Sequence, residues 1–167
     1  MHSTTRPGLP CPIAAFVPQS QGMCQLDHIL AVDDYSLVAD VTPSADNVFA
    51  TDAGIPGWTG LEWLAQAVAA WAGWHAQANH EQARSESPKI GFLIGSKRFE
   101  SLRDYLAVDR TYQVSVRLDF QADNGLSHFQ GEIMDDDGTR LAHGTLTVFQ
   151  PTAGELPEQA INQETPS

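Results

Sequence analysis

The sequence predicts an α+β fold in which one long central helix packs on an antiparallel β-sheet. The first supporting observation is that residues 61–74, within a helix predicted over residues 61–79, are apolar on nearly every side, as expected of a buried helix. The second is the strict alternation of apolar and polar residues over 112–120, which is typical of a strand with one wet face. The third is Asp137-Gly138, a dipeptide that suits the turn of a hairpin.

The elements before the helix are short. Residues 12–17 predict a helical turn, and residues 23–32 and 35–41 predict a hairpin that reverses at Asp33-Asp34. A loop rich in Pro, Gly, Asp and Asn covers residues 42–57. The helix then starts with Thr59 as its N-cap, and Glu62 completes a Thr-x-x-Glu capping box.

Strands account for the rest of the folded unit, in the overall order β-β-α-β-β-β-β. The four predicted after the helix cover residues 90–99, 112–120, 126–134 and 141–149. Residues 1–10 and 151–167 are rich in Pro, Ser, Thr, Gln and Glu, so we expect two mobile ends around a domain spanning residues 11–150.

Composition narrows the class of protein. A chain of 167 residues fits one domain. Its formal charge of -12 argues against nucleic acid or an anionic membrane surface as a partner. Cys11 and Cys24 make neither a metal signature nor a disulfide framework. No signal peptide and no run of ~18 apolar residues is present, so we expect a soluble cytoplasmic protein.

Glu62 and Gln66 are the only polar side chains between Leu61 and Trp74, and their spacing of four places them on one helix face. Glu62 has two interpretations, a cap of the helix start or a functional carboxylate in apolar surroundings. Pro56-Gly57 gives a backbone that a ligand can approach closely, and amides at a helix start can hold an oxyanion. Gly57 and Gly60 also fit as simple turn residues.

Residues 56–66 read Pro-Gly-x-x-x-x-Glu-x-x-Ala-Gln, which resembles the helix-start motif of the 3-hydroxyacyl-acyl-carrier-protein dehydratases, enzymes of the hot-dog fold. Val17-Pro18-Gln19 and the segment 25–29 resemble the opening of that family. With Gly91-Phe92-Leu93-Ile94-Gly95, the chain looks closest to the dehydratases of aryl-polyene-type clusters. The resemblance implies a hot-dog fold over residues 11–150 and the loss of water from a 3-hydroxyacyl thioester.

The resemblance also implies roles for individual residues. Glu62 would be the acid that protonates the leaving 3-hydroxyl, Gly57 an amide facing the thioester oxygen, and Gln66 the support of Glu62. The family's second catalytic residue is a histidine in a His-Phe-Pro-Gly loop, whereas residues 47–54 contain no histidine. Asp52 is the ionisable group in the second half of this loop, and it is either the base or a solvated loop aspartate.

Three further expectations concern the substrate and its carrier. Trp58, Gly60 and Gln66 are candidates for binding the substrate; Trp58 either lines an acyl channel at the tunnel mouth of the hot dog or belongs to the core and a subunit contact. Lys97-Arg98, with Arg103 and Arg110 nearby, forms the densest basic cluster, which either receives a carrier's phosphopantetheine or acidic helix or is a solvated strand end. No metal and no organic cofactor are expected apart from that phosphopantetheine, because His75 and His80 lie on different helix faces.

Three functions remain open. The first is the dehydratase; the second is a hot-dog acyl thioesterase, in which Glu62 or Asp52 activates water; the third is a non-catalytic partner subunit, suggested by the missing histidine. We expect an acyl carrier protein as a partner. We also expect a homodimer, or a heterodimer with a related dehydratase, because the sites of the resembled family lie between two protomers.

Overall fold

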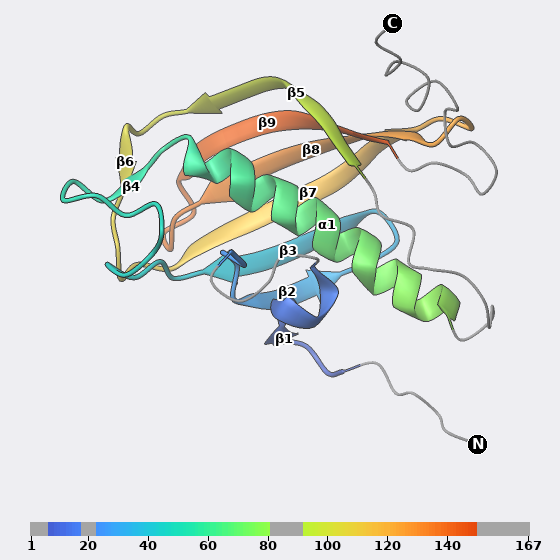
Figure 1. The fold of residues 1–167 in the computed structure, drawn as a ribbon, viewed down its shortest axis with the longest axis horizontal. Helices are drawn as coiled ribbons and strands as arrows, with labels where there is room; N and C mark the ends of the chain where they lie inside the picture. The colour runs from blue at the N-terminus through green and yellow to red at the C-terminus, as the bar shows by residue number, and fades with distance from the viewer. Residues whose placement is uncertain (1–6, 18–22, 81–91, 150–167) are drawn as a thin grey trace, which may run out of the picture.

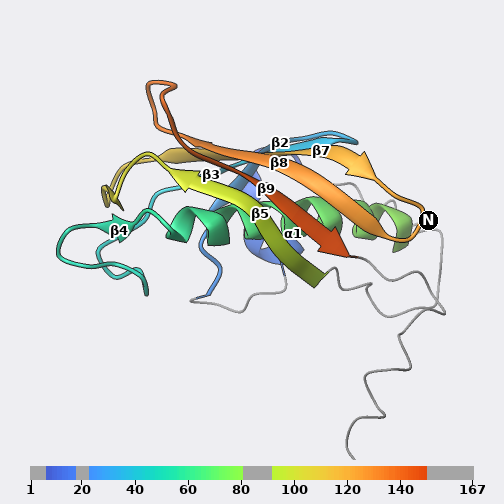
Figure 2. The ribbon, with the colours of Figure 1, turned by 90° about the horizontal axis from the view of Figure 1, so that it is seen from above.

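The structure is a computed structural model that describes residues 7–17, 23–80 and 92–149. One long helix, α1 (Thr59–His80), lies across one face of a curved sheet (Figures 1 and 2). The other elements, in chain order, are β1 (Cys11–Pro12), the 3-10 helix η1 (Ile13–Phe16), β2 (His28–Val32), β3 (Ser36–Val41), β4 (Ile55–Pro56), β5 (Phe92–Ser101), β6 (Tyr105–Leu106), β7 (Tyr112–Gln121), β8 (Leu126–Met134) and β9 (Arg140–Phe149).

The main sheet is antiparallel, with the strand order β1-β2-β3-β7-β8-β9-β5, and β4 and β6 form a separate small ladder. β5 follows the helix in sequence and pairs only with β9 among the described strands, so it forms one edge of the sheet. The predicted architecture is therefore confirmed, including the short turn at η1, the β2-β3 hairpin and the β8-β9 hairpin at Gly138, whose φ is +88°.

Several boundaries differ from the prediction. β2 begins at His28 rather than at residue 23, because the backbone before it bonds elsewhere: the Gln25 amide donates to the Gln66 side chain. The two-residue strands β1, β4 and β6 were not predicted, since two residues carry no periodicity. Residues 90 and 91 of the predicted third strand, and most of the predicted mobile ends (1–6 and 151–167), lie outside the described residues.

The alternation over β7 holds for its first half only. Tyr112, Val114 and Val116 are buried, as predicted, but Phe120 is 57% exposed. The pairing of β7 with β8 shifts register between Leu118 and Phe120. Such a bulge interrupts the two-residue period and turns the following side chains away from the core.

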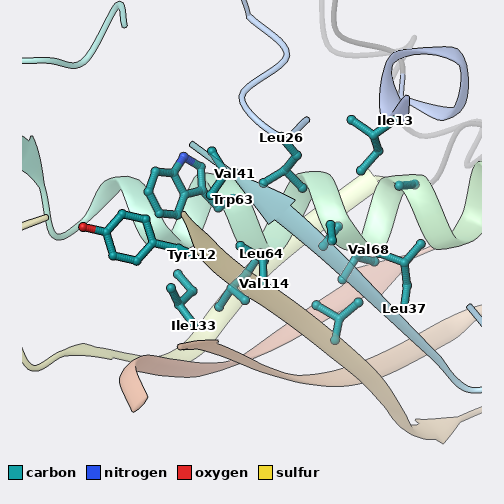
Figure 3. Packing of buried hydrophobic residues seen from close by; sticks show 14 of the residues in the cluster. Ile13, Leu26, Leu37, Val41, Trp63, Leu64, Val68, Tyr112, Val114 and Ile133 are labelled. Carbon is teal, nitrogen blue, oxygen red and sulfur yellow. The ribbon is translucent and has the colours of Figure 1, made fainter. Parts of the chain in front are cut away.

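The core lies between α1 and the sheet (Figure 3). Trp63, Leu64 and Val68 of the helix are buried with Leu37 of β3 and Val114 of β7. The helix packs closely on the sheet: a Cβ atom at Gly131 of β8 would lie 2.7 Å from Leu64 Cδ2. No helix in the described part of the chain is long and apolar enough to cross a membrane.

Candidate active site

The start of α1 is tied to the segment between β5 and β6. The Gly57 amide donates to the Asp104 carbonyl at 2.8 Å. A Cβ at residue 57 would collide with the Arg103 carbonyl oxygen and the Ser101 hydroxyl, so glycine is required for this close approach. The role suggested for the Gly57 amide, facing a thioester oxygen, is not supported by this geometry, because the amide already has an acceptor.

The predicted capping box is wrong. Thr59 is the first residue of α1, and its hydroxyl is buried without a hydrogen-bond partner among the described residues. The amides of Gly60 and Leu61 instead donate to the carbonyls of Gly57 and Trp58, at 3.1 and 3.0 Å. The amides of Trp58 and Thr59 find no acceptor within the described residues. Thr59 is fully buried, whereas Trp58 is exposed and lines the hollow beside the helix start, so the Trp58 amide is the available donor for an oxyanion.

Glu62 is half-buried, one helical turn beyond Trp58. Its Oε1 accepts a hydrogen bond from Gln66 Nε2 at 3.0 Å, so the contact expected between these two side chains is present. Gln66 is fully buried. Within the described part of the chain, the second oxygen of Glu62, Oε2, has no hydrogen-bond partner. This oxygen is the one left for exchanging a proton with a ligand.

A hollow of about 500 Å³ opens beside the helix start. It is lined by Pro56, Gly57, Trp58, Ser101, Arg103, Asp104 and Tyr105. Trp58 is 59% exposed, and its ring meets Phe49 edge-on with the centroids 5.3 Å apart. Trp58 is thus held from the loop side and faces the hollow, as the acyl-channel expectation requires. Gly60 is not on its surface: it is buried, and a Cβ there would lie 2.7 Å from Ile133 Cδ1 and 3.2 Å from Phe99 Cζ.

Asp52 is exposed in the tight turn from Thr51 to Gly54. It lines a different hollow of about 540 Å³, which shares no lining residue with the one at the helix start. Glu62 lines neither hollow. Neither of these two hollows therefore brings Asp52 and Glu62 together.

The basic cluster is only partly assembled. Arg98 is exposed on β5, whereas the side chain of Lys97 lies outside what the structure describes. Arg110 is diverted to an ion pair with Asp136 at 3.0 Å. Arg103 is exposed and lines the hollow at the helix start, and it makes no ion pair among the described residues.

Sequence reasoning missed the contributions of Ser101, Asp104 and Tyr105 to the hollow. They come from a segment about forty residues beyond the helix start, and no local pattern marks that segment. It also missed Gln25 and Asn47, which are linked to the Glu62 support: Asn47 Nδ2 donates to Gln25 Oε1 at 2.7 Å.

Two other kinds of site find no support. Among the described residues, no group of three His, Cys, Asp or Glu side chains is placed to hold a metal ion. The second kind is a cysteine nucleophile. Cys24 lies next to Gln25, but burial raises the pKa of its thiol. A raised pKa keeps the sulfur protonated and so disfavours its use as a nucleophile.

Comparison with known proteins identifies the family of this chain. The model of the ApeP-like family, described as ApeP dehydratase, matches residues 11–161. A chain of the dehydratase heterocomplex ApeI:P from Xenorhabdus doucetiae is similar over 92% of this chain and 99% of its own, with 27% identity and a TM-score of 0.75. No curated protein matches by sequence.

More distant structures share the fold alone. The Escherichia coli PaaI protein from the phenylacetic acid degradation operon is 12% identical, with a TM-score of 0.57, over 73% of this chain and 81% of its own. A hypothetical thioesterase from Streptococcus pneumoniae TIGR4, solved with coenzyme A, is also 12% identical, with the same TM-score, over 74% and 87%. The fold is the hot-dog fold expected from the sequence.

Proposed function

Because the chain belongs to the ApeP-like dehydratase family, we propose that it removes water from a carrier-bound 3-hydroxyacyl thioester on the way to an aryl polyene, with Glu62 as the general acid. The observation that carries this assignment is the arrangement of Glu62. Its Oε1 is held by the buried Gln66, its Oε2 has no partner among the described residues, and it lies one turn from Trp58 at the open hollow. A carboxyl group fixed on one side can deliver a proton from the other.

The chemistry needs three groups. A base takes the C2 proton, a donor stabilises the negative charge that develops on the thioester oxygen, and an acid protonates the 3-hydroxyl as the C3–O bond breaks. The products are an enoyl thioester and water. Glu62 supplies the acid, and the amide of the exposed Trp58 at the positive end of the helix supplies the donor.

The base is the missing part. Residues 47–54 contain no histidine, and Asp52 lines a different hollow from the one at the helix start. The base therefore comes from a histidine of a related subunit, so that this chain contributes the acid half of a composite site. Its similarity to a chain of a dehydratase heterocomplex supports this pairing. Asp52 remains the alternative base within the chain.

The edge strand β5 is the surface proposed for the partner. Its outer side pairs with no described strand, and β5 ends at Ser101, which lines the hollow. A subunit that adds its own edge strand there extends the sheet by backbone hydrogen bonds. It also brings its loop close to the helix start of this chain.

An acidic acyl carrier protein is the proposed substrate carrier. The chain is itself strongly acidic, so binding an acidic partner needs a local cation, and Arg103 at the rim of the hollow is free of ion pairs among the described residues. Arg98 is exposed on β5, the strand that precedes Arg103 in the chain. The proposed role of these two cations is to bind the phosphate of phosphopantetheine or the carrier's acidic surface. We propose the cytoplasm as the compartment in which the chain meets this carrier.

The substitution Glu62→Gln tests the proposal. The chain is mixed with a histidine-bearing related dehydratase and incubated with a 3-hydroxyacyl thioester, and mass detection of the loss of water separates dehydration from the free acid that a thioesterase would release. We expect turnover to fall by at least ~100-fold, the usual scale for losing a general acid, while folding is retained. Glu132→Gln, a half-buried glutamate on β8, is the matched control. Unchanged turnover in a folded Glu62→Gln variant removes Glu62 from the chemistry.

A further inference from the structure

The Gln66 carboxamide is clasped from both sides by the backbone of one segment. The Gln25 amide donates to Gln66 Oε1 at 2.7 Å, and Gln66 Nε2 donates to the Met23 carbonyl at 2.8 Å. These two bonds allow the carboxamide only one orientation, because its oxygen faces a donor and its nitrogen faces an acceptor.

This orientation determines what Gln66 offers to Glu62. The remaining N–H of Nε2 donates to Glu62 Oε1 at 3.0 Å, and Gln66 presents no acceptor to that oxygen. When Glu62 is protonated, its proton therefore does not lie toward Gln66. It is directed to Oε2, the oxygen without a partner among the described residues.

Asn47 holds the segment that makes the clasp. Its Oδ1 accepts from the Phe49 amide at 2.9 Å, and its Nδ2 donates to Gln25 Oε1 at 2.7 Å, so its own orientation is fixed in the same way. The Phe49 ring contacts Trp58. Asn47 is thus connected to both ends of the candidate site, to Glu62 through Gln25 and Gln66 and to Trp58 through Phe49.

We propose that Asn47 is a positioning residue for the dehydration: it holds Gln25, and through it the clasp on Gln66, so that Glu62 carries its reactive proton on Oε2. The inference rests on the function proposed above. In the step concerned, the Oε2–H bond breaks as a new O–H bond forms on the 3-hydroxyl, and the C3–O electron pair leaves with water. The C2–H electron pair becomes the C2=C3 double bond, and that proton goes to the partner's histidine.

Side-chain ¹⁵N–¹H NMR spectra of the full chain test the clasp without any assay of activity. The Gln66 carboxamide signals are identified by their loss in Gln66→Met. Asn47→Asp keeps the acceptor for the Phe49 amide but turns the donor facing Gln25 into an acceptor, and Asn47→Ala removes both. We expect the Gln66 signals to shift in both variants. They should stay in place in Asn124→Asp, a matched control whose Oδ1 accepts from the Leu126 amide in an exposed turn.

Kinetics test the consequence for the proton. With a 3-hydroxyacyl thioester and a histidine-bearing related dehydratase, we expect Asn47→Asp to lower kcat by about 10- to 100-fold, the scale of a small misplacement of a reacting group, and to change KM less than about twofold. In a Glu62→Gln background the same change should have no further effect, because Asn47 acts through Glu62.

The outcomes are distinguishable. Gln66 signals that do not move in either Asn47 variant overturn the proposal that Asn47 holds the clasp. A loss of kcat on Asn47→Asp that persists in full in the Glu62→Gln background overturns the proposal that Asn47 acts through Glu62. If the Gln66 signals move in the Asn47 variants but the wild-type protein never dehydrates the thioester, the proposed function is contradicted, and with it the proton assignment.

Discussion

Gln66→Met is a direct test of how the site is built into the fold. Methionine keeps the length of the side chain and removes the carboxamide, which makes three hydrogen bonds: with Gln25 N, Met23 O and Glu62 Oε1. The change therefore leaves a buried backbone amide and a part-buried carbonyl without partners, and it releases Glu62.

The size of the effect follows from those groups. Each unsatisfied buried polar group costs about 1–3 kcal/mol, and the part-buried carbonyl of Met23 lies at the lower end because water can replace its partner. The more apolar methionine recovers about 1 kcal/mol by burial. We expect a net loss of about 1–3 kcal/mol in the free energy of unfolding. For a chain of this length that corresponds to a melting temperature lower by about 2–12 °C.

Urea unfolding at a fixed protein concentration measures this loss, with the slope against urea as a check that the unfolded state is unchanged. Gln77→Met is the control, since Gln77 lies on the same helix and makes a single exposed bond, at 3.3 Å, to the Ala15 carbonyl. It should change stability by less than about 0.5 kcal/mol. A Gln66→Met variant as stable as that control would show that the clasp does not exist in solution.

Three other predictions follow from the structure. Gly73→Ala should destabilise by about 1–3 kcal/mol, because its Cβ would collide with the Phe16 carbonyl; equal urea midpoints would refute the contact between α1 and η1. Burial raises the pKa of Tyr112, whose hydroxyl donates to the Ala107 carbonyl at 2.9 Å. The contribution of the protonated Tyr112 to the free energy of unfolding is complete below the unfolded pKa of about 10 and is lost as pH rises through the folded pKa. The Tyr112→Phe variant should therefore lose less stability than the wild type above pH ~10, and identical pH profiles of the two proteins would contradict this. If Phe49 matches the Phe of the His-Phe-Pro-Gly loop, the histidine position is Val48, which is 62% exposed. Val48→His should raise dehydration by the purified chain at least ~10-fold, and no gain would argue against a missing base at this position.

The fold could be predicted from the sequence because its signals are long and periodic. The helix has an apolar surface over many turns, and the first half of β7 alternates strictly. The errors fall where a local pattern competes with tertiary contacts. Residues 23–27 read as a strand but are recruited to hold Gln66, and the alternation at Phe120 is broken by a bulge.

The candidate site was only half predictable. Glu62 and Gln66 are polar residues in an apolar segment, so their spacing marked them. The predicted Thr59 cap is absent because the amides of Gly60 and Leu61 donate to two backbone carbonyls, and no sequence pattern reveals these bonds. Arg103 and Tyr105 reach the hollow through the β4-β6 ladder, which is only two residues long on each side. The shape of the site therefore depends on long-range pairing rather than on a motif.

The rate of dehydration with and without a histidine-bearing related dehydratase tests the central claim most directly. The purified chain is given a 3-hydroxyacyl thioester alone and then mixed with that second protein, and the enoyl product is measured by mass. We expect little product from the chain alone, a large gain in the mixture, and suppression of that gain by Glu62→Gln in this chain. Turnover of ~1–1000 per second by the chain alone, typical of a competent enzyme, would contradict the composite site and direct the search for the base to Asp52.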